Sequence, residues 1–189
     1  MSPIAGILLA AGASSRFGSA KLLARLADGR PIGLASLQNL RGALADVRVV
    51  VRRGDLALRT LFEAERAAVV ECDDAHLGMS RSLVAGVHAC GDAAGWVIAL
   101  GDMPFVSPVT IRAVADALRA GAQIALPVYR RRRGHPVGFG AGLKDKLLQV
   151  SGDEGARAVV RRNAGRLRLV DCDDPGILRD IDTPRDLEG

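Results

Sequence analysis

Short apolar runs alternate along this chain with segments in which apolar residues recur every three or four positions. The runs are too short for helices and predict buried strands at 4–9, 47–51, 68–70, 96–100 and 167–170. The segments with helical spacing predict helices at 32–43, 56–64, 80–89, 108–119, 143–149 and 154–163. Strands that alternate with helices in this way are typical of an α/β fold with a parallel sheet.

The alternation changes after residue 124. The strand-like segments 124–128 and 136–139 flank a polar turn at 130–134, which predicts a hairpin in place of a helical crossover. We therefore expect a three-layer α/β/α, Rossmann-like fold whose sheet is mixed and mostly parallel, with one antiparallel element. Residues 1–189 are expected to form a single domain, because the length suits one aliphatic core.

Three polar positions suggest where helices begin. Ser80 is the expected N-cap of the helix through residue 89, and Ser107 followed by Pro108 is the expected start of the next one. Thr183 and Pro184 with Asp186 are expected to open a terminal helix.

Composition narrows the class of protein. Hydrophobic residues make up 49% of the chain and charged residues 25%, which indicates a globular protein. No apolar run is long enough to cross a bilayer, and the first residues lack a signal-peptide pattern, so we expect a cytoplasmic protein without a membrane partner. The three cysteines have no zinc-ligand spacing and no even pairing, and are expected to be free thiols. A net charge of +5 favours anionic ligands without distinguishing nucleotides from nucleic acid.

The strongest candidate for chemistry is the segment LAAGASSRFGSAK, which directly follows the first strand. Its small residues allow backbone N–H groups to approach phosphate oxygens, and two cations add fixed positive charge. Its glycine spacing matches neither a Walker loop nor a dinucleotide fingerprint. The residues expected to bind a nucleotide here are Leu9, Ala10, Ala11, Gly12, Ser14, Ser15, Arg16 and Lys21.

Carboxylates follow in two other places. Asp102 comes just after the predicted strand 96–100, at the edge of the sheet where α/β folds bind ligands. Magnesium prefers one or two carboxylates together with substrate phosphates, so Asp102 is a candidate metal ligand. Near the C-terminus Asp180 and Asp182 offer a second carboxylate, and the local sequence leaves open whether Asp182 is a ligand or a helix cap.

The loop is similar to the signature loop of the molybdenum cofactor nucleotidyltransferases, a branch of the nucleotide-diphospho-sugar transferase fold. Further segments resemble that family in the same order and cover nearly the whole chain: GMSRSL at 78–83, LGDMP at 100–104, GHP at 134–136, GDEGAR at 152–157 and DIDTP at 180–184.

The resemblance implies an enzyme that moves a nucleoside monophosphate from a nucleoside triphosphate to a phosphate-bearing, molybdopterin-type acceptor and releases pyrophosphate. It implies Mg²⁺ as cofactor, with Mn²⁺ as an alternative, and favours Asp182 as the second ligand beside Asp102. Arg16, Lys21 and Asp102 would then be catalytic. Gly78, Ser80 and Ser82 would bind the base and ribose, and His135 would lie on the acceptor side. A molybdoenzyme or its maturation factor would be a further partner.

The family's cytidylyl branch resembles LAAG, whereas its guanylyl branch carries Gly in place of Ala11, so the sequence favours CTP. Four alternatives remain: a guanylyltransferase, an isoprenoid or sugar-phosphate nucleotidyltransferase, a non-catalytic maturation protein, and a nucleic-acid-binding protein. The last rests only on net charge and on the four arginines at 130–133, and a solvated hairpin tip is the commoner meaning of such a run.

Overall fold

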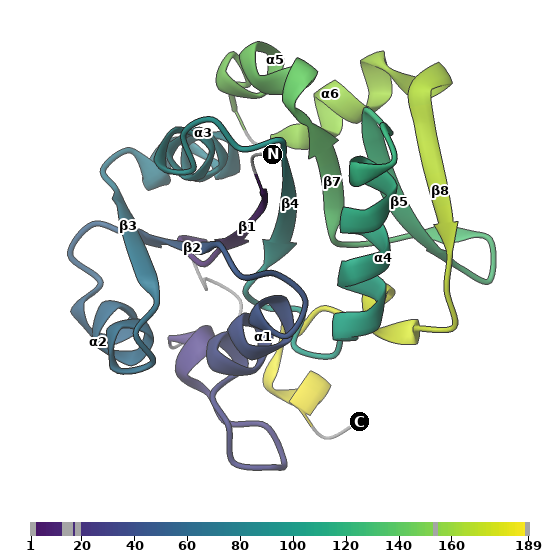
Figure 1. Cartoon of the computed structure of the whole chain (residues 1–189). Coiled ribbons are helices and arrows are strands. Elements are labelled where there is room, and N and C mark those ends of the chain that lie inside the picture. Colours follow the sequence, from purple (N-terminus) through teal and green to yellow (C-terminus); the bar gives the residue numbers. More distant parts are fainter. Residues whose placement is uncertain (1–2, 13–16, 18–19, 153–154, 188–189) are drawn as a thin grey trace.

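The computed structural model describes residues 3–12, 17, 20–152 and 155–187, and these build one eight-stranded mixed sheet with helices on both faces (Figure 1). The expected three-layer architecture is therefore confirmed. The strands are β1 Ile4–Leu9, β2 Val47–Arg52, β3 Ala68–Cys72, β4 Gly95–Leu100, β5 Ile124–Tyr129, β6 Arg132–Arg133, β7 Val137–Gly140 and β8 Leu167–Asp171.

The strand order is β3-β2-β1-β4-β7-β5-β6, and β8 pairs with β5. The strands β3, β2, β1 and β4 run parallel to one another, and β8 is parallel to β5. The strand β7 is antiparallel to both of its neighbours, β4 and β5, and β6 is antiparallel to β5. The predicted antiparallel element thus lies inside the sheet, between its two parallel parts.

Helices cover the sheet in two groups. The helices α1, α2 and α4 pack into one apolar core, and α3, α5 and α6 pack into the other, on opposite faces of the sheet (Figure 1). Their bounds are α1 Ile32–Arg41, α2 Leu56–Ala64, α3 Met79–Ala89, α4 Pro108–Arg119, α5 Lys144–Leu148 and α6 Ala156–Arg162. Short 3-10 turns lie at Lys21–Leu23, Ala75–Leu77, Ala141–Leu143, Ala164–Arg166, Pro175–Leu178 and Pro184–Leu187.

The central strand β1 shows why both faces are apolar. Its side chains alternate, so that Ile4 and Leu8 belong to the core with α1, while Ala5 and Ile7 belong to the core with α3. Close packing of unlike side chains in the two cores and the pairing of β1 with both β2 and β4 fix the register of the strand. The end of β1 is thereby held in place, and the predicted phosphate loop begins there.

The helix starts agree with expectation at one position and differ at another. The Ser107 hydroxyl accepts a hydrogen bond from the Val109 N–H, which confirms the predicted cap. Ser80, however, is not an N-cap. Gly78 holds that position at a φ of 115°, a conformation that favours glycine, so α3 begins at Met79 and Ser80 is buried within the first turn.

The expected terminal helix is a single 3-10 turn, Pro184–Leu187. Here Asp186 does the capping: its Oδ2 accepts hydrogen bonds from the N–H groups of Asp182 and Thr183 and from the Thr183 hydroxyl. No helix in the described part of the chain is long and apolar enough to cross a membrane.

Candidate nucleotide and metal site

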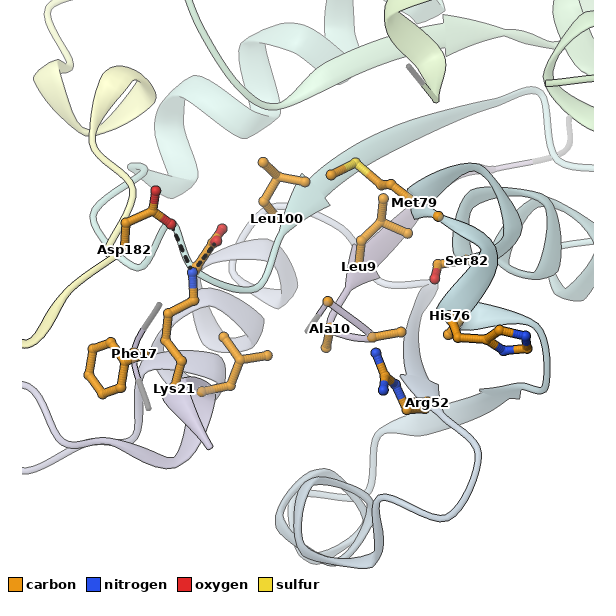
Figure 2. Close-up of a pocket in the computed structure, with 16 residues that line it drawn as sticks. Leu9, Ala10, Phe17, Lys21, Arg52, His76, Met79, Ser82, Leu100 and Asp182 are labelled. Carbon is orange, nitrogen blue, oxygen red and sulfur yellow. Dashed lines mark hydrogen bonds and ion pairs between the residues drawn. The ribbon is translucent and has the colours of Figure 1, made fainter. Parts of the chain in front are cut away.

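A cleft of about 590 Å³ opens at the carboxyl ends of β1, β2 and β4. Figure 2 shows how the side chains that line it come from separate elements. The lining residues are Leu9, Ala10, Ala11, Gly12, Phe17, Lys21, Leu22, Arg52, Ala75, His76, Gly78, Met79, Ser82, Leu100, Asp102 and Asp182. This is the edge of the sheet at which α/β folds bind ligands.

One end of the cleft carries a cation between two carboxylates. The Lys21 ammonium donates hydrogen bonds to Asp102 Oδ2 at 2.8 Å and to Asp182 Oδ1 at 3.2 Å (Figure 2). The Lys21 side chain is only 12% exposed. Burial lowers the pKa of Lys21, but the hydrogen bonds and charges of Asp102 and Asp182 raise it by more, so the pKa lies above its ordinary value. The group is therefore an ammonium ion at neutral pH.

A backbone hydrogen bond brings Asp182 beside Asp102. Asp102 follows β4, and its carbonyl oxygen accepts a hydrogen bond from the Ile181 N–H at 2.9 Å. Ile181 is itself buried in the core with α1, which anchors the C-terminal segment beside β4. Asp182 is thus placed at the cleft, while Asp180 is exposed and does not line it.

The donor set fits a divalent metal ion. Two carboxylates converge on one position that a cation, the Lys21 ammonium, already occupies, and hard carboxylate oxygens are the ligands that Mg²⁺ and Mn²⁺ prefer. Among the described residues no cluster of three or more His, Cys, Asp or Glu side chains forms a fuller metal site. A metal held by Asp102 and Asp182 would therefore need further oxygens, such as those of substrate phosphates.

Several predicted nucleotide-binding residues lie together in this cleft: Leu9, Ala10, Ala11, Gly12, Lys21, Gly78, Ser82 and Asp102. Ser14, Ser15 and Arg16 lie outside the described residues. Ser80 does not line the cleft, because its position in the first turn of α3 buries it completely. The roles of all these residues remain predictions.

His135, the predicted acceptor residue, does not line this cleft, although the cavity that it borders shares Leu100 with the cleft. It borders a small separate cavity with Ser36 and Asn39, and its buried Nδ1 has no hydrogen-bond partner among the described residues. Burial lowers the pKa of His135 below its ordinary value and the charge of Arg157 lowers it further, against the opposing charges of Asp102 and Asp180.

The sequence interpretation missed Arg52 and His76, which line the cleft beside Ala75 and Ser82. A signal for Arg52 was available. It is the first polar residue after the apolar run 49–51, just as Asp102 follows the run 96–100 closely. His76 had no such signal, because it lies in the 3-10 turn Ala75–Leu77 and does not directly follow an apolar run.

Comparison with known proteins shows which family and which solved structures the chain resembles. A family model described as a MobA-like NTP transferase domain matches residues 6–167. Nicotine blue oxidoreductase from Paenarthrobacter nicotinovorans is 31% identical over an alignment that covers 95% of this chain and 92% of that protein. Purine catabolism protein PucB from Bacillus subtilis is 31% identical, with 97% and 93% covered. The structure of Rv0371c from Mycobacterium tuberculosis in complex with manganese is 28% identical, covers 99% of this chain and 97% of that one, and superposes with a TM-score of 0.78.

Proposed function

The chain belongs to the MobA-like NTP transferase family and is a nucleotidyltransferase, and from that premise we propose that it transfers CMP from CTP to the terminal phosphate of a molybdenum-pterin cofactor, with Mg²⁺ as the metal. The observation that carries the proposal is the convergence of Lys21, Asp102 and Asp182 at one end of a strand-edge cleft. The solved relative in complex with manganese supports a divalent metal.

In the proposed reaction a phosphate oxygen of the acceptor attacks the α-phosphorus of CTP in line, and pyrophosphate leaves. A phosphate monoester has a second pKa of about 6 and is already largely ionised at pH 7, so the reaction needs no dedicated general base. The chain's task is then to position the two phosphates and to balance their charge.

Three side chains would do this at the described end of the cleft. Asp102 and Asp182 would hold the metal, which when bound neutralises developing negative charge on the phosphates. Lys21 would leave the carboxylates and donate to phosphate oxygens, where its fixed charge stabilises the transition state. The backbone from Ala10 to Gly12 would lie along the nucleotide, since small side chains let it approach closely.

The choice of CTP rests on Ala11. It is 4% exposed and lines the cleft, so its methyl group fills space that glycine would leave open. A pyrimidine needs less room than a purine at that place. The choice of a molybdenum-pterin acceptor is inferred from the family. A molybdoenzyme or its maturation factor would receive the product.

One relative is named an oxidoreductase, and a redox function is the rival from another class. A paired carboxylate site with a lysine suits metal-assisted phosphate chemistry, whereas hydride transfer requires no such cluster. The geometry of Lys21, Asp102 and Asp182 therefore favours nucleotidyl transfer.

The test is a pyrophosphate-release assay with CTP, GTP, ATP and UTP, each combined with molybdopterin, sugar phosphates and a phosphorylated isoprenoid precursor, in Mg²⁺ and in Mn²⁺. CTP with molybdopterin should give the fastest release. Faster release with another acceptor would reject the molybdopterin assignment. Oxidation of NADH or NADPH, with no pyrophosphate from any pair, would reject nucleotidyl transfer altogether.

A further inference from the structure

The cleft has a second charged end, which the proposed chemistry does not use. In the sheet β1 lies between β2 and β4, and Leu9 at its end is in register with both Val50 and Leu100. Arg52 comes two residues after Val50, and Asp102 comes two residues after Leu100. The guanidinium of Arg52 and the carboxylates therefore lie on opposite sides of the end of β1, as Figure 2 shows for Arg52 and Asp182.

This separation matches the layout of a nucleotide. Neighbouring strands are about 4.8 Å apart, so β2 and β4 are separated by roughly 10 Å. If the phosphates lie at Lys21 and the carboxylates, the ribose and the base extend across the end of β1 toward β2. The base then reaches the part of the cleft lined by Arg52, Ala75 and Ser82.

Arg52 is half-buried, and its guanidinium forms no hydrogen bond or ion pair with any other residue in the described ranges. The next residue provides a contrast, because Arg53 is 65% exposed and pairs with Asp73 at 2.7 Å. A guanidinium presents several N–H donors in a fixed plane and has no acceptor of its own. Its position in the cleft therefore calls for a ligand with acceptors that lie in one plane.

The other lining groups at this end suit a flat ring. Leu9 and Met79 provide aliphatic surface, and Met79 is 48% exposed although its neighbour Ser80 is buried. An apolar slot with a few placed polar groups is the usual form of a site for a heterocyclic ligand.

We propose that Arg52 reads the nucleobase: its paired donors select bases that offer two adjacent acceptors and reject bases that place an N–H at one of the two positions. Cytosine offers O2 and N3, and guanine offers O6 and N7. Uracil carries a proton on N3, and each comparable edge of adenine pairs one acceptor with the N6 amino group. This inference rests on the proposed function for the direction in which the nucleotide lies. Ala11 then separates pyrimidines from purines, and Arg52 separates cytosine from uracil.

The experiment measures the dissociation constants of CTP, UTP, GTP and ATP by titration calorimetry, with Mg²⁺ present and no acceptor. The protein should bind CTP more tightly than UTP and ATP. Arg52→Met should weaken the binding of CTP by about 10-fold or more, since a bidentate base contact is typically worth that much discrimination. The affinities for UTP and ATP should change much less. Arg52→Lys should also lose the discrimination, because an ammonium keeps the charge and loses the planar fork.

The matched control is Arg53→Met, which removes the neighbouring guanidinium and should leave all four affinities unchanged. An equal loss for all four nucleotides in Arg52→Met, restored by Arg52→Lys, would mean that Arg52 contacts phosphates, and would overturn the inference. Unchanged affinities in a folded Arg52→Met variant would overturn it as well.

These outcomes are separable from failure of the proposed function. If molybdopterin supports no pyrophosphate release while the four affinities behave as expected, the acceptor assignment is wrong and Arg52 still reads the base. If the protein binds GTP more tightly than CTP, and Arg52→Met selectively weakens the binding of GTP, the cytidylyl assignment is wrong and the role of Arg52 stands.

Discussion

Lys21 and Asp102 are 81 positions apart in the sequence, and a hydrogen bond of 2.8 Å joins their side chains. The same ammonium also donates to Asp182, so one lysine bridges both carboxylates of the candidate metal site. A divalent cation and the Lys21 ammonium would therefore compete for the same oxygens until substrate phosphates offer the lysine another partner.

Replacing the lysine tests this competition. Lys21→Met should lower turnover by about 100-fold or more, because it removes a donor to the reacting phosphates. The same variant should bind Mn²⁺ more tightly than the unchanged protein when no nucleotide is present, since the carboxylates lose their competing cation. Pyrophosphate release gives the first result, and electron paramagnetic resonance of free Mn²⁺ gives the second.

Lys144→Met and Arg132→Ala are controls for a lost cation away from the cleft. Lys144 pairs with Asp92 at 3.0 Å, and Arg132 is exposed in β6. Neither change should alter turnover at saturating acceptor by more than a small factor. A large loss in Arg132→Ala would place the arginine run 130–133 in the acceptor site.

The carboxylates can be separated by amide substitutions of nearly equal volume. Asp102→Asn should abolish metal-supported turnover with little change in the melting temperature, and Asp182→Asn should reduce turnover strongly. Asp180→Asn should have little effect, because Asp180 does not line the cleft. Loss of activity in Asp180→Asn alone would show that the second ligand is assigned wrongly.

Ala11→Gly tests the choice of base. Removing the buried methyl group should raise kcat/KM with GTP more than it lowers kcat/KM with CTP. A single steric contact of this kind is worth about 1–3 kcal/mol, or roughly 10–200-fold in the ratio of kcat/KM with CTP to kcat/KM with GTP. An unchanged ratio would show that Ala11 does not contact the base.

His135 should make the fold sensitive to mild acid. Its lowered pKa means that the folded protein keeps the imidazole neutral, while the unfolded chain binds a proton as the pH falls below about 6.5. The free energy of unfolding should therefore decrease as the pH falls from 6.5 toward the pKa of the folded state. The decrease should be smaller in His135→Gln, as measured by urea unfolding at several pH values.

The exposed His88 provides the control for that series, since His88→Gln should reproduce the pH dependence of the unchanged protein. Parallel curves for His135→Gln and the unchanged protein would contradict the assignment of acid sensitivity to His135.

Much of the fold could be predicted because burial on both faces of the sheet makes its strands continuous apolar runs. The predicted bounds of β1 and α2 match the structure residue for residue. The start of α3 could not be read in the same way, because it depends on the φ of Gly78, and Ser80 is a good cap by residue type alone. The last turn was overestimated, since Asp186 caps a segment too short to form an α-helix.

The residues of the candidate site were predictable to the extent that they follow strands. Lys21 and Asp102 come after β1 and β4, and position in the chain alone placed them at one edge of the sheet. The contact between Lys21 and Asp182 could not be foreseen, because 161 positions separate them and the Ile181 hydrogen bond to Asp102 decides where the C-terminal segment lies. Asp180, two residues before Asp182, is exposed and does not line the cleft.

The strand β7 lies between β4 and β5 in the sheet but follows both of them in the sequence. The ribosome therefore does not make the strands in the order in which they pair. A ribosome that has made β1 to β5 has not yet made the strand that joins β5 to β4, so β4 remains an open edge until residue 140 has emerged. Open strand edges invite pairing with other chains. While the stretch between 100 and 140 is being made, the nascent chain therefore presents an unpaired edge of β4, and a translational pause placed there would lengthen that exposure.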